Sequence, residues 1–96
     1  MREKIKKMKT LLVTGGAGFI GANFVHYWLA SYPQDKVVVL DALTYAGNLE
    51  SLNPVKENPN FVFCHGNICD TPLVEMLIKE HKVNTIVHFA AESHVD

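Results

Sequence analysis

The amino-acid sequence predicts an α/β protein built on a parallel β-sheet, and two observations carry this prediction. The apolar run from Leu11 to Val13 breaks into glycines and then opens into a helical pattern. A second apolar run ends at Asp41, twenty residues after Gly21. Near-continuous apolar runs that alternate with helical segments are typical of parallel strands covered on both faces. We therefore expect part of a doubly wound parallel sheet, with its first four strands in the order 3-2-1-4.

Four segments are expected to form these strands, because each is an apolar run bounded by turn-forming residues. They are residues 9–14, 36–40, 61–64 and 85–89. Helical connections between parallel strands imply right-handed crossovers, which bring the carboxyl ends of all strands to one edge of the sheet. We expect the residues that follow the strands to converge on that edge.

Apolar residues at helical spacing predict a first helix over residues 19–31, which Pro33 ends because proline cannot continue a helix. A shorter helix is expected near residues 48–52, in an otherwise long connection. The last helix is expected to begin with Thr71 as its N-cap and Pro72 in its first position. The predicted apolar stripes contain Ile20, Phe24, Val25, Trp28 and Leu29 in the first helix and Leu73, Leu77 and Ile78 in the last.

The glycines after the first strand have the spacing of a dinucleotide-binding fingerprint. Gly16, Gly18 and Gly21 fit Gly-x-Gly-x-x-Gly, and Gly15, Gly18 and Gly21 fit the alternative Gly-x-x-Gly-x-x-Gly. Glycine permits the tight turn and the close approach of a pyrophosphate, which the N-terminus of the following helix attracts. The carboxylate of Asp41 is expected to accept hydrogen bonds from the adenosine ribose. This context favours a Rossmann-type dinucleotide site over a glycine-rich turn without a ligand.

The length and the net charge of the chain restrict which functions are expected. The chain has 96 residues, which is short for a complete enzyme of this type, and a formal net charge of −1 gives no reason to expect nucleic acid or a membrane surface as a partner. Residues 1–8 are basic and are expected to be a solvated extension. Residues 9–96 are expected to form the first half of a dinucleotide-binding domain, truncated after its fourth strand.

Cysteine and histidine usage indicates neither disulfides nor a metal site. Cys64 and Cys69 are the only cysteines, and no signal peptide or apolar span is visible, so we expect reduced thiols and a cytoplasmic protein. The five histidines lack metal-ligand spacing. A site made by Cys64, His65 and Cys69 is conceivable but disfavoured, and no metal is expected.

Three segments resemble a known family. Residues 14–21, with the sequence TGGAGFIG, resemble the signature of the extended short-chain dehydrogenase/reductase family. Residues 41–49 (DALTYAGNL) and 88–96 (HFAAESHVD) resemble dTDP-glucose 4,6-dehydratases in particular. Related sugar-nucleotide epimerases share the first motif but usually lack the other two.

The resemblance implies a tightly held NAD and the substrate dTDP-glucose, which is converted to dTDP-4-keto-6-deoxyglucose. It places the pyrophosphate along the start of the first helix, the adenosine beyond the second and third strands, and the nicotinamide beyond the fourth strand. The implied cofactor-binding residues are Gly15, Gly18, Phe19, Ile20, Gly21, Asp41, Ala42, Leu43, Thr44, Asn67, Ile68, Phe89, Ala90, Ala91, Glu92 and Ser93. Ser93 is also implied as a contact to the sugar substrate.

The chain departs from the family pattern in places. Asn67 stands where the family commonly has aspartate, and Ala42 where many relatives have lysine. No usable Tyr-x-x-x-Lys pair occurs, because Pro33 interrupts the single match between Tyr32 and Lys36. We therefore expect no catalytic residues in this chain, no turnover by the chain alone, and a longer homodimeric parent enzyme. Another NAD-dependent sugar-nucleotide epimerase or decarboxylase, or a non-catalytic nucleotide-binding module, remains the alternative.

Overall fold

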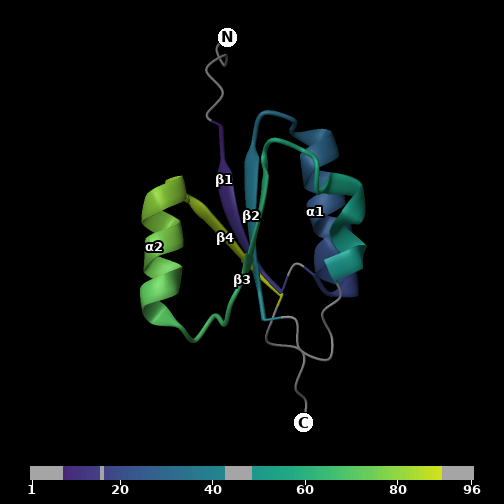
Figure 1. Ribbon diagram of the computed structural model, residues 1–96. Helices are drawn as coiled ribbons and strands as arrows, with labels where there is room; N and C mark the ends of the chain where they lie inside the picture. Colours follow the sequence, from purple (N-terminus) through teal and green to yellow (C-terminus); the bar gives the residue numbers. More distant parts are fainter. Residues whose placement is uncertain (1–7, 16, 43–48, 90–96) are drawn as a thin grey trace.

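Four parallel strands form the sheet of the computed structural model, which describes residues 8–15, 17–42 and 49–89 (Figure 1). The strands are β1 (Thr10–Thr14), β2 (Lys36–Asp41), β3 (Phe61–His65) and β4 (Thr85–His88), and the helices are α1 (Phe19–Ser31), the 3-10 helix η2 (Leu49–Val55) and α2 (Thr71–His81). The strand order is β3-β2-β1-β4. The predicted order and the predicted parallel pairing are therefore confirmed.

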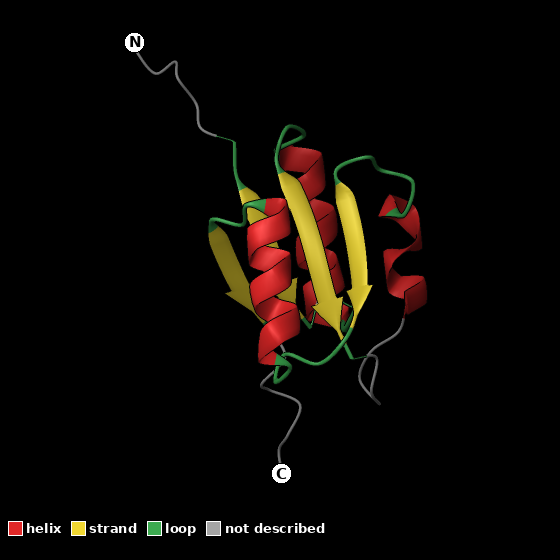
Figure 2. Cartoon of the chain, turned by 60° about the vertical axis from the view of Figure 1, so that its left-hand side comes forward, coloured by secondary structure: helices red, strands yellow, loops and turns green. Residues whose placement is uncertain are grey.

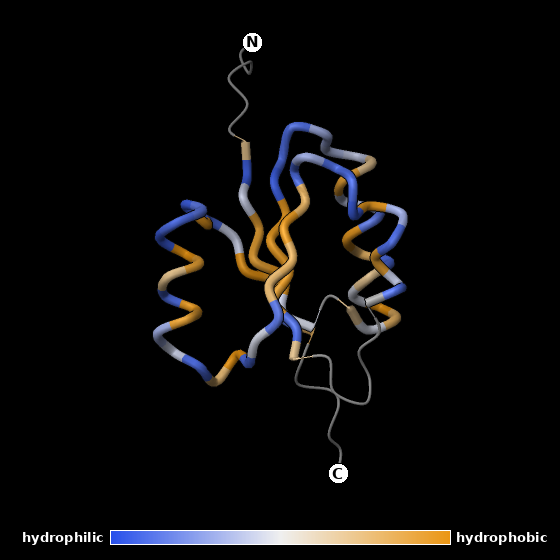
Figure 3. Tube along the Cα trace, viewed as in Figure 1, coloured by the Kyte–Doolittle hydropathy of each residue, from blue (hydrophilic) through white to orange (hydrophobic). Residues whose placement is uncertain are grey.

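The helices cover the sheet on both faces. Figure 2 shows α2 in front of the sheet and α1 and η2 behind it. Successive side chains of a strand point to opposite faces. Accordingly Leu11 and Val13 of β1 pack in the cluster that contains Val25 of α1, whereas Leu12 packs with Leu77 of α2. Both faces of β1 and β2 are thus buried, as the apolar segments in the middle of Figure 3 indicate.

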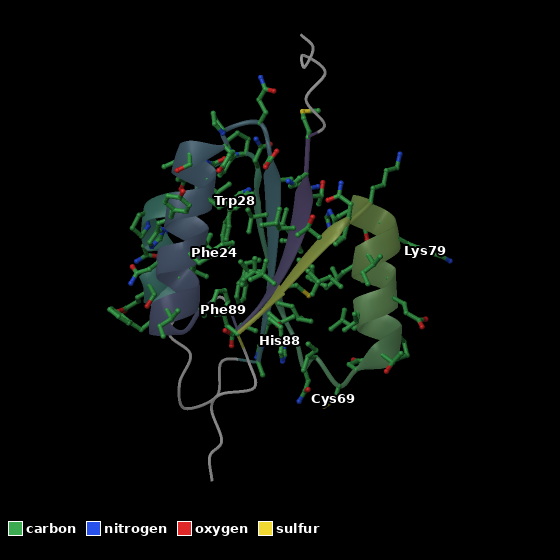
Figure 4. The ribbon with its side chains drawn as sticks, turned by 180° about the vertical axis from the view of Figure 1, so that it is seen from behind. Phe24, Trp28, Cys69, Lys79, His88 and Phe89 are labelled. Carbon is green, nitrogen blue, oxygen red and sulfur yellow. The ribbon has the colours of Figure 1, made fainter. Side chains whose placement is uncertain are left out.

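Helix α1 has the predicted bounds, and an aromatic row fixes it on the sheet. The N–H of Tyr32 donates to the carbonyl of Trp28 at 2.8 Å and ends the helix before Pro33. The ring centroids of Phe24 and Trp28 lie 5.6 Å apart, and those of Phe24 and Phe89 lie 5.5 Å apart (Figure 4). Phe89 follows β4, so this row ties the carboxyl end of β4 to α1.

The predicted N-cap of the last helix is wrong. Asp70, and not Thr71, caps α2, because the Asp70 carboxylate accepts a hydrogen bond from the N–H of Leu73 at 3.2 Å. Thr71 is the first helical residue, and Pro72 follows in the first turn, where its missing N–H costs nothing. Both aspartate and threonine are good N-caps, and here the aspartate lies one residue earlier.

Other boundaries differ slightly from the prediction. Strand β1 begins one residue later than expected, β2 and β3 extend one residue further, and β4 ends one residue earlier. The short helix expected near residues 48–52 is the 3-10 helix η2, which continues through Pro54.

A buried carboxylate joins three elements at the amino edge of the sheet. Asp35 is 8% exposed and accepts hydrogen bonds from the backbone N–H of Lys9 at 2.9 Å and from Nε1 of Trp28 at 3.0 Å. Next to it, the N–H of Lys36 donates to the carbonyl of Lys9. Asp35 therefore fixes the start of β1 against the end of α1 and the start of β2.

We expect Asp35→Ala to lower the free energy of unfolding by roughly 2 kcal/mol, because two part-buried N–H groups lose their acceptor. Urea unfolding checks this, with Gln34→Ala as the matched control. Gln34 is exposed, so its substitution should change stability by no more than about 0.5 kcal/mol. Equal stability of the two variants would contradict the role of Asp35.

Candidate functional site

The carboxyl edge of the sheet begins with a tight turn after β1. Gly15 has a φ of 76°, a conformation that glycine adopts at no steric cost. Its N–H donates to the carbonyl of Leu40 at 3.0 Å, so the turn is attached to the neighbouring strand. The chain then reaches Gly18, which is the N-cap of α1 and accepts a hydrogen bond from the N–H of Ala22 at 2.8 Å.

The first turn of α1 leaves backbone donors open. The N–H groups of Phe19, Ile20 and Gly21 precede the first helical hydrogen bond and have no partner among the residues that the structure describes. No side chain of the described residues caps this end, and the first turn carries no acidic residue. The positive end of the helix dipole adds to these donors, so the arrangement suits an anion.

Asp41 lies beside this turn, at the end of β2. Its side chain is 9% exposed, and its Oδ2 accepts a hydrogen bond from the N–H of Ala17 at 2.8 Å. The pairing of Thr14 with Leu40 in the β1–β2 ladder places Asp41 level with the turn. The structure therefore brings together the predicted glycine turn and the predicted carboxylate. The two residues in contact, Ala17 and Asp41, are 24 positions apart in the sequence.

The loop after β3 adds a third segment to the edge. The N–H of Gly66 donates to the carbonyl of Asp41 at 3.1 Å. A Cβ at Gly66 would overlap Leu73 and would lie 3.1 Å from Cδ1 of Leu40, so only glycine fits there without a shift. This close approach places the exposed residues Asn67 and Ile68 next to the end of β2.

Asn67 already takes part in its own turn. Its side-chain oxygen accepts a hydrogen bond from the N–H of Cys69 at 2.7 Å, and its carbonyl accepts one from the N–H of Asp70. The Asn67 side-chain oxygen thus already accepts one hydrogen bond, which leaves its second lone pair for a ligand.

Two histidines at this edge received no role from the sequence. Nε2 of His65 lies 3.0 Å from the carbonyl of Ala42, which can only accept, so His65 donates and holds the chain after β2. Nδ1 of His88 lies 2.5 Å from Oγ1 of Thr14, a buried hydroxyl at the end of β1. Each histidine is the last residue of a strand (Figure 4 shows His88 at the end of β4). This position, at the edge where the site residues converge, is the sequence feature that could have indicated a role for them.

Several predicted site residues lie outside the described part of the chain: Gly16, Leu43, Thr44, Ala90, Ala91, Glu92 and Ser93. Phe89 is described, and its ring packs against Phe24 in the core, so only its backbone lies at the edge. Among the described residues, no group of three or more histidine, cysteine or acidic side chains has an arrangement that would hold a metal ion. Within the same residues, no helix is both long and apolar enough to cross a membrane.

Comparison with known proteins extends over nearly the whole chain. Residues 12–96 match the model of the GDP-mannose 4,6 dehydratase family. The dTDP-glucose 4,6-dehydratase of Mycobacterium tuberculosis is 57% identical over 86 residues, which are 90% of this chain and 25% of that protein. The chain therefore spans about a quarter of the length of this relative.

Two solved structures are similar to this chain in both sequence and fold. The dTDP-glucose 4,6-dehydratase of Bacillus anthracis, in complex with NAD, is 53% identical with a TM-score of 0.86, over 88% of this chain and 27% of that one. The enzyme of Streptomyces venezuelae, with NAD and TYD bound, is 55% identical with a TM-score of 0.81, over 91% of this chain and 28% of that one. The chain belongs to the GDP-mannose 4,6 dehydratase family.

Proposed function

We propose that this chain is the amino-terminal, NAD-binding part of a dTDP-glucose 4,6-dehydratase, which converts dTDP-glucose to dTDP-4-keto-6-deoxyglucose. One structural observation carries the proposal: the open N–H groups of Phe19, Ile20 and Gly21 lie at the same edge as the carboxylate of Asp41. Family membership and the NAD present in the structures of two relatives support it.

The residues present fit the cofactor. A diphosphate needs several N–H donors, and the first turn of α1 offers them and carries no acidic residue of its own. A ribose diol needs an acceptor such as the Asp41 carboxylate. Asn67 and Ile68 are exposed beside Asp41, where they would flank the adenine. When bound, NAD supplies a hydride acceptor for the sugar and later a hydride donor.

This chain contributes binding and orientation. The aromatic row from Trp28 to Phe89 and the contact between Thr14 and His88 fix the end of β4 relative to the glycine turn. Ser93, which lies outside the described residues, is the proposed contact to the sugar. The proton donor and the dehydration acids would come from elsewhere in the full-length enzyme.

We also propose a cytoplasmic location and a homodimeric parent enzyme. Cys64 and Cys69 are free thiols in the structure, which fits a reducing compartment. Two-fold dimers are the commonest assemblies of soluble oligomers.

The cofactor preference is testable. We expect NAD to bind at least about tenfold more tightly than NADP, because the Asp41 carboxylate repels a 2′-phosphate and the sole arginine, Arg2, precedes the first strand. Calorimetric titration of the protein that carries this chain with each cofactor, at matched ionic strength, measures the ratio. Equal affinities for NAD and NADP would contradict the proposal that Asp41 contacts the adenosine ribose.

The reaction is tested by mass spectrometry of the sugar nucleotide. Incubation of the full-length protein with NAD and dTDP-glucose should give a product lighter by one water, with no net consumption of NAD. An epimerase would leave the mass unchanged. A binding module would retain NAD and leave the sugar nucleotide unaltered. Either of the last two results would overturn the proposed activity.

A further inference from the structure

The carboxylate of Asp41 contacts the glycine turn directly. Its Oδ2 lies 2.8 Å from the backbone nitrogen of Ala17, a residue with no exposed surface. We propose that Asp41 is a positioning residue: it holds the phosphate-binding turn in its binding shape before any ligand arrives, in addition to its contact with the ribose. This inference rests on the proposed NAD site.

Among the described residues, two further backbone hydrogen bonds involve this turn. The N–H of Gly15 is bound to Leu40 of β2, and the N–H of Gly18 reaches the carbonyl of Gly15 at 3.2 Å, within the turn itself. Between these two points, Ala17 provides the described contact that ties the turn to another element. Because α1 starts directly after Gly18, this attachment holds the turn next to the open N–H groups of the helix.

The chemistry of the contact calls for a carboxylate. A buried N–H without an acceptor is costly, and a charged acceptor forms about twice as strong a hydrogen bond as a neutral one. Asparagine at position 41 would keep an oxygen for Ala17 but lose the charge, and alanine would lose both. The order of support for the turn is therefore aspartate, then asparagine, then alanine.

This dual role links cofactor selectivity to the shape of the turn. Replacing Asp41 would relieve repulsion of a 2′-phosphate, but it would also release the N–H of Ala17. Such a variant should then bind every adenine diphosphate more weakly, including one whose ribose has no hydroxyl groups. A carboxylate that contacts only the ribose would not affect that ligand.

The first test needs no ligand and uses amide hydrogen exchange of the protein that carries this chain. In the wild-type protein, the amide of Ala17 should be protected. Asp41→Asn should reduce this protection partly, and Asp41→Ala by about tenfold or more, the loss expected from one charge-assisted hydrogen bond. The matched control is Asp70→Ala, which removes a carboxylate–amide contact with Leu73 on α2 and should leave Ala17 unchanged.

The second test uses ADP and 2′,3′-dideoxy-ADP as probes. Asp41→Ala should weaken the binding of both, with about a tenfold loss for the dideoxy compound and a larger loss for ADP. If Asp41→Ala does not fold, Asp41→Asn should show the same pattern with smaller changes.

The outcomes separate the two proposals. Unchanged Ala17 protection in the Asp41 variants, or a loss of affinity confined to ADP, would overturn the positioning role and leave the NAD site intact. Failure of the wild-type protein to bind ADP or NAD would overturn the proposed function, whereas the exchange of the Ala17 amide would still decide whether Asp41 holds the turn.

Discussion

The parallel pairing of β1 with β2 is the contact on which the rest of the structure depends. Its register sets Thr14 opposite Leu40, which lets the turn after β1 bind the carbonyl of Leu40 and brings Ala17 within 2.8 Å of the Asp41 carboxylate. A shift of one residue would exchange the buried faces of the strand and separate these groups. Burial on both faces therefore specifies the site as well as the core.

The two edges of this sheet differ in how their polar groups are used. At the amino edge, Asp35 is buried, and its carboxylate accepts hydrogen bonds from Lys9 and Trp28. At the carboxyl edge, Asp41 secures the turn, while the first turn of α1 keeps donors without partners in the described part of the chain. The backbone donors of this first turn, which have no partner in the described part of the chain, thus lie at the edge where a parallel sheet of this kind takes its ligands.

The local and periodic features were predictable from the sequence. Helix α1 has its predicted bounds, and the strand order follows from alternating elements and right-handed crossovers. The cap of α2 was misplaced because adjacent aspartate and threonine both suit that position. The contacts of Ala17 with Asp41 and of Thr14 with His88 join residues 24 and 74 positions apart, and no spacing rule predicts such pairs. The fingerprint indicated which residues matter but not that one of them supports another.

The central claim is that the first turn of α1 and the end of β2 together bind the diphosphate and ribose of NAD. The most direct measurement is the change in backbone amide chemical shifts of the isotope-labelled protein when NAD is added. The account predicts the largest changes at Phe19, Ile20 and Gly21, smaller ones at Asp41, and none at Lys9 and Asp35 on the opposite edge. Unchanged amides in the first turn of α1, with the largest changes at the amino edge, would contradict it.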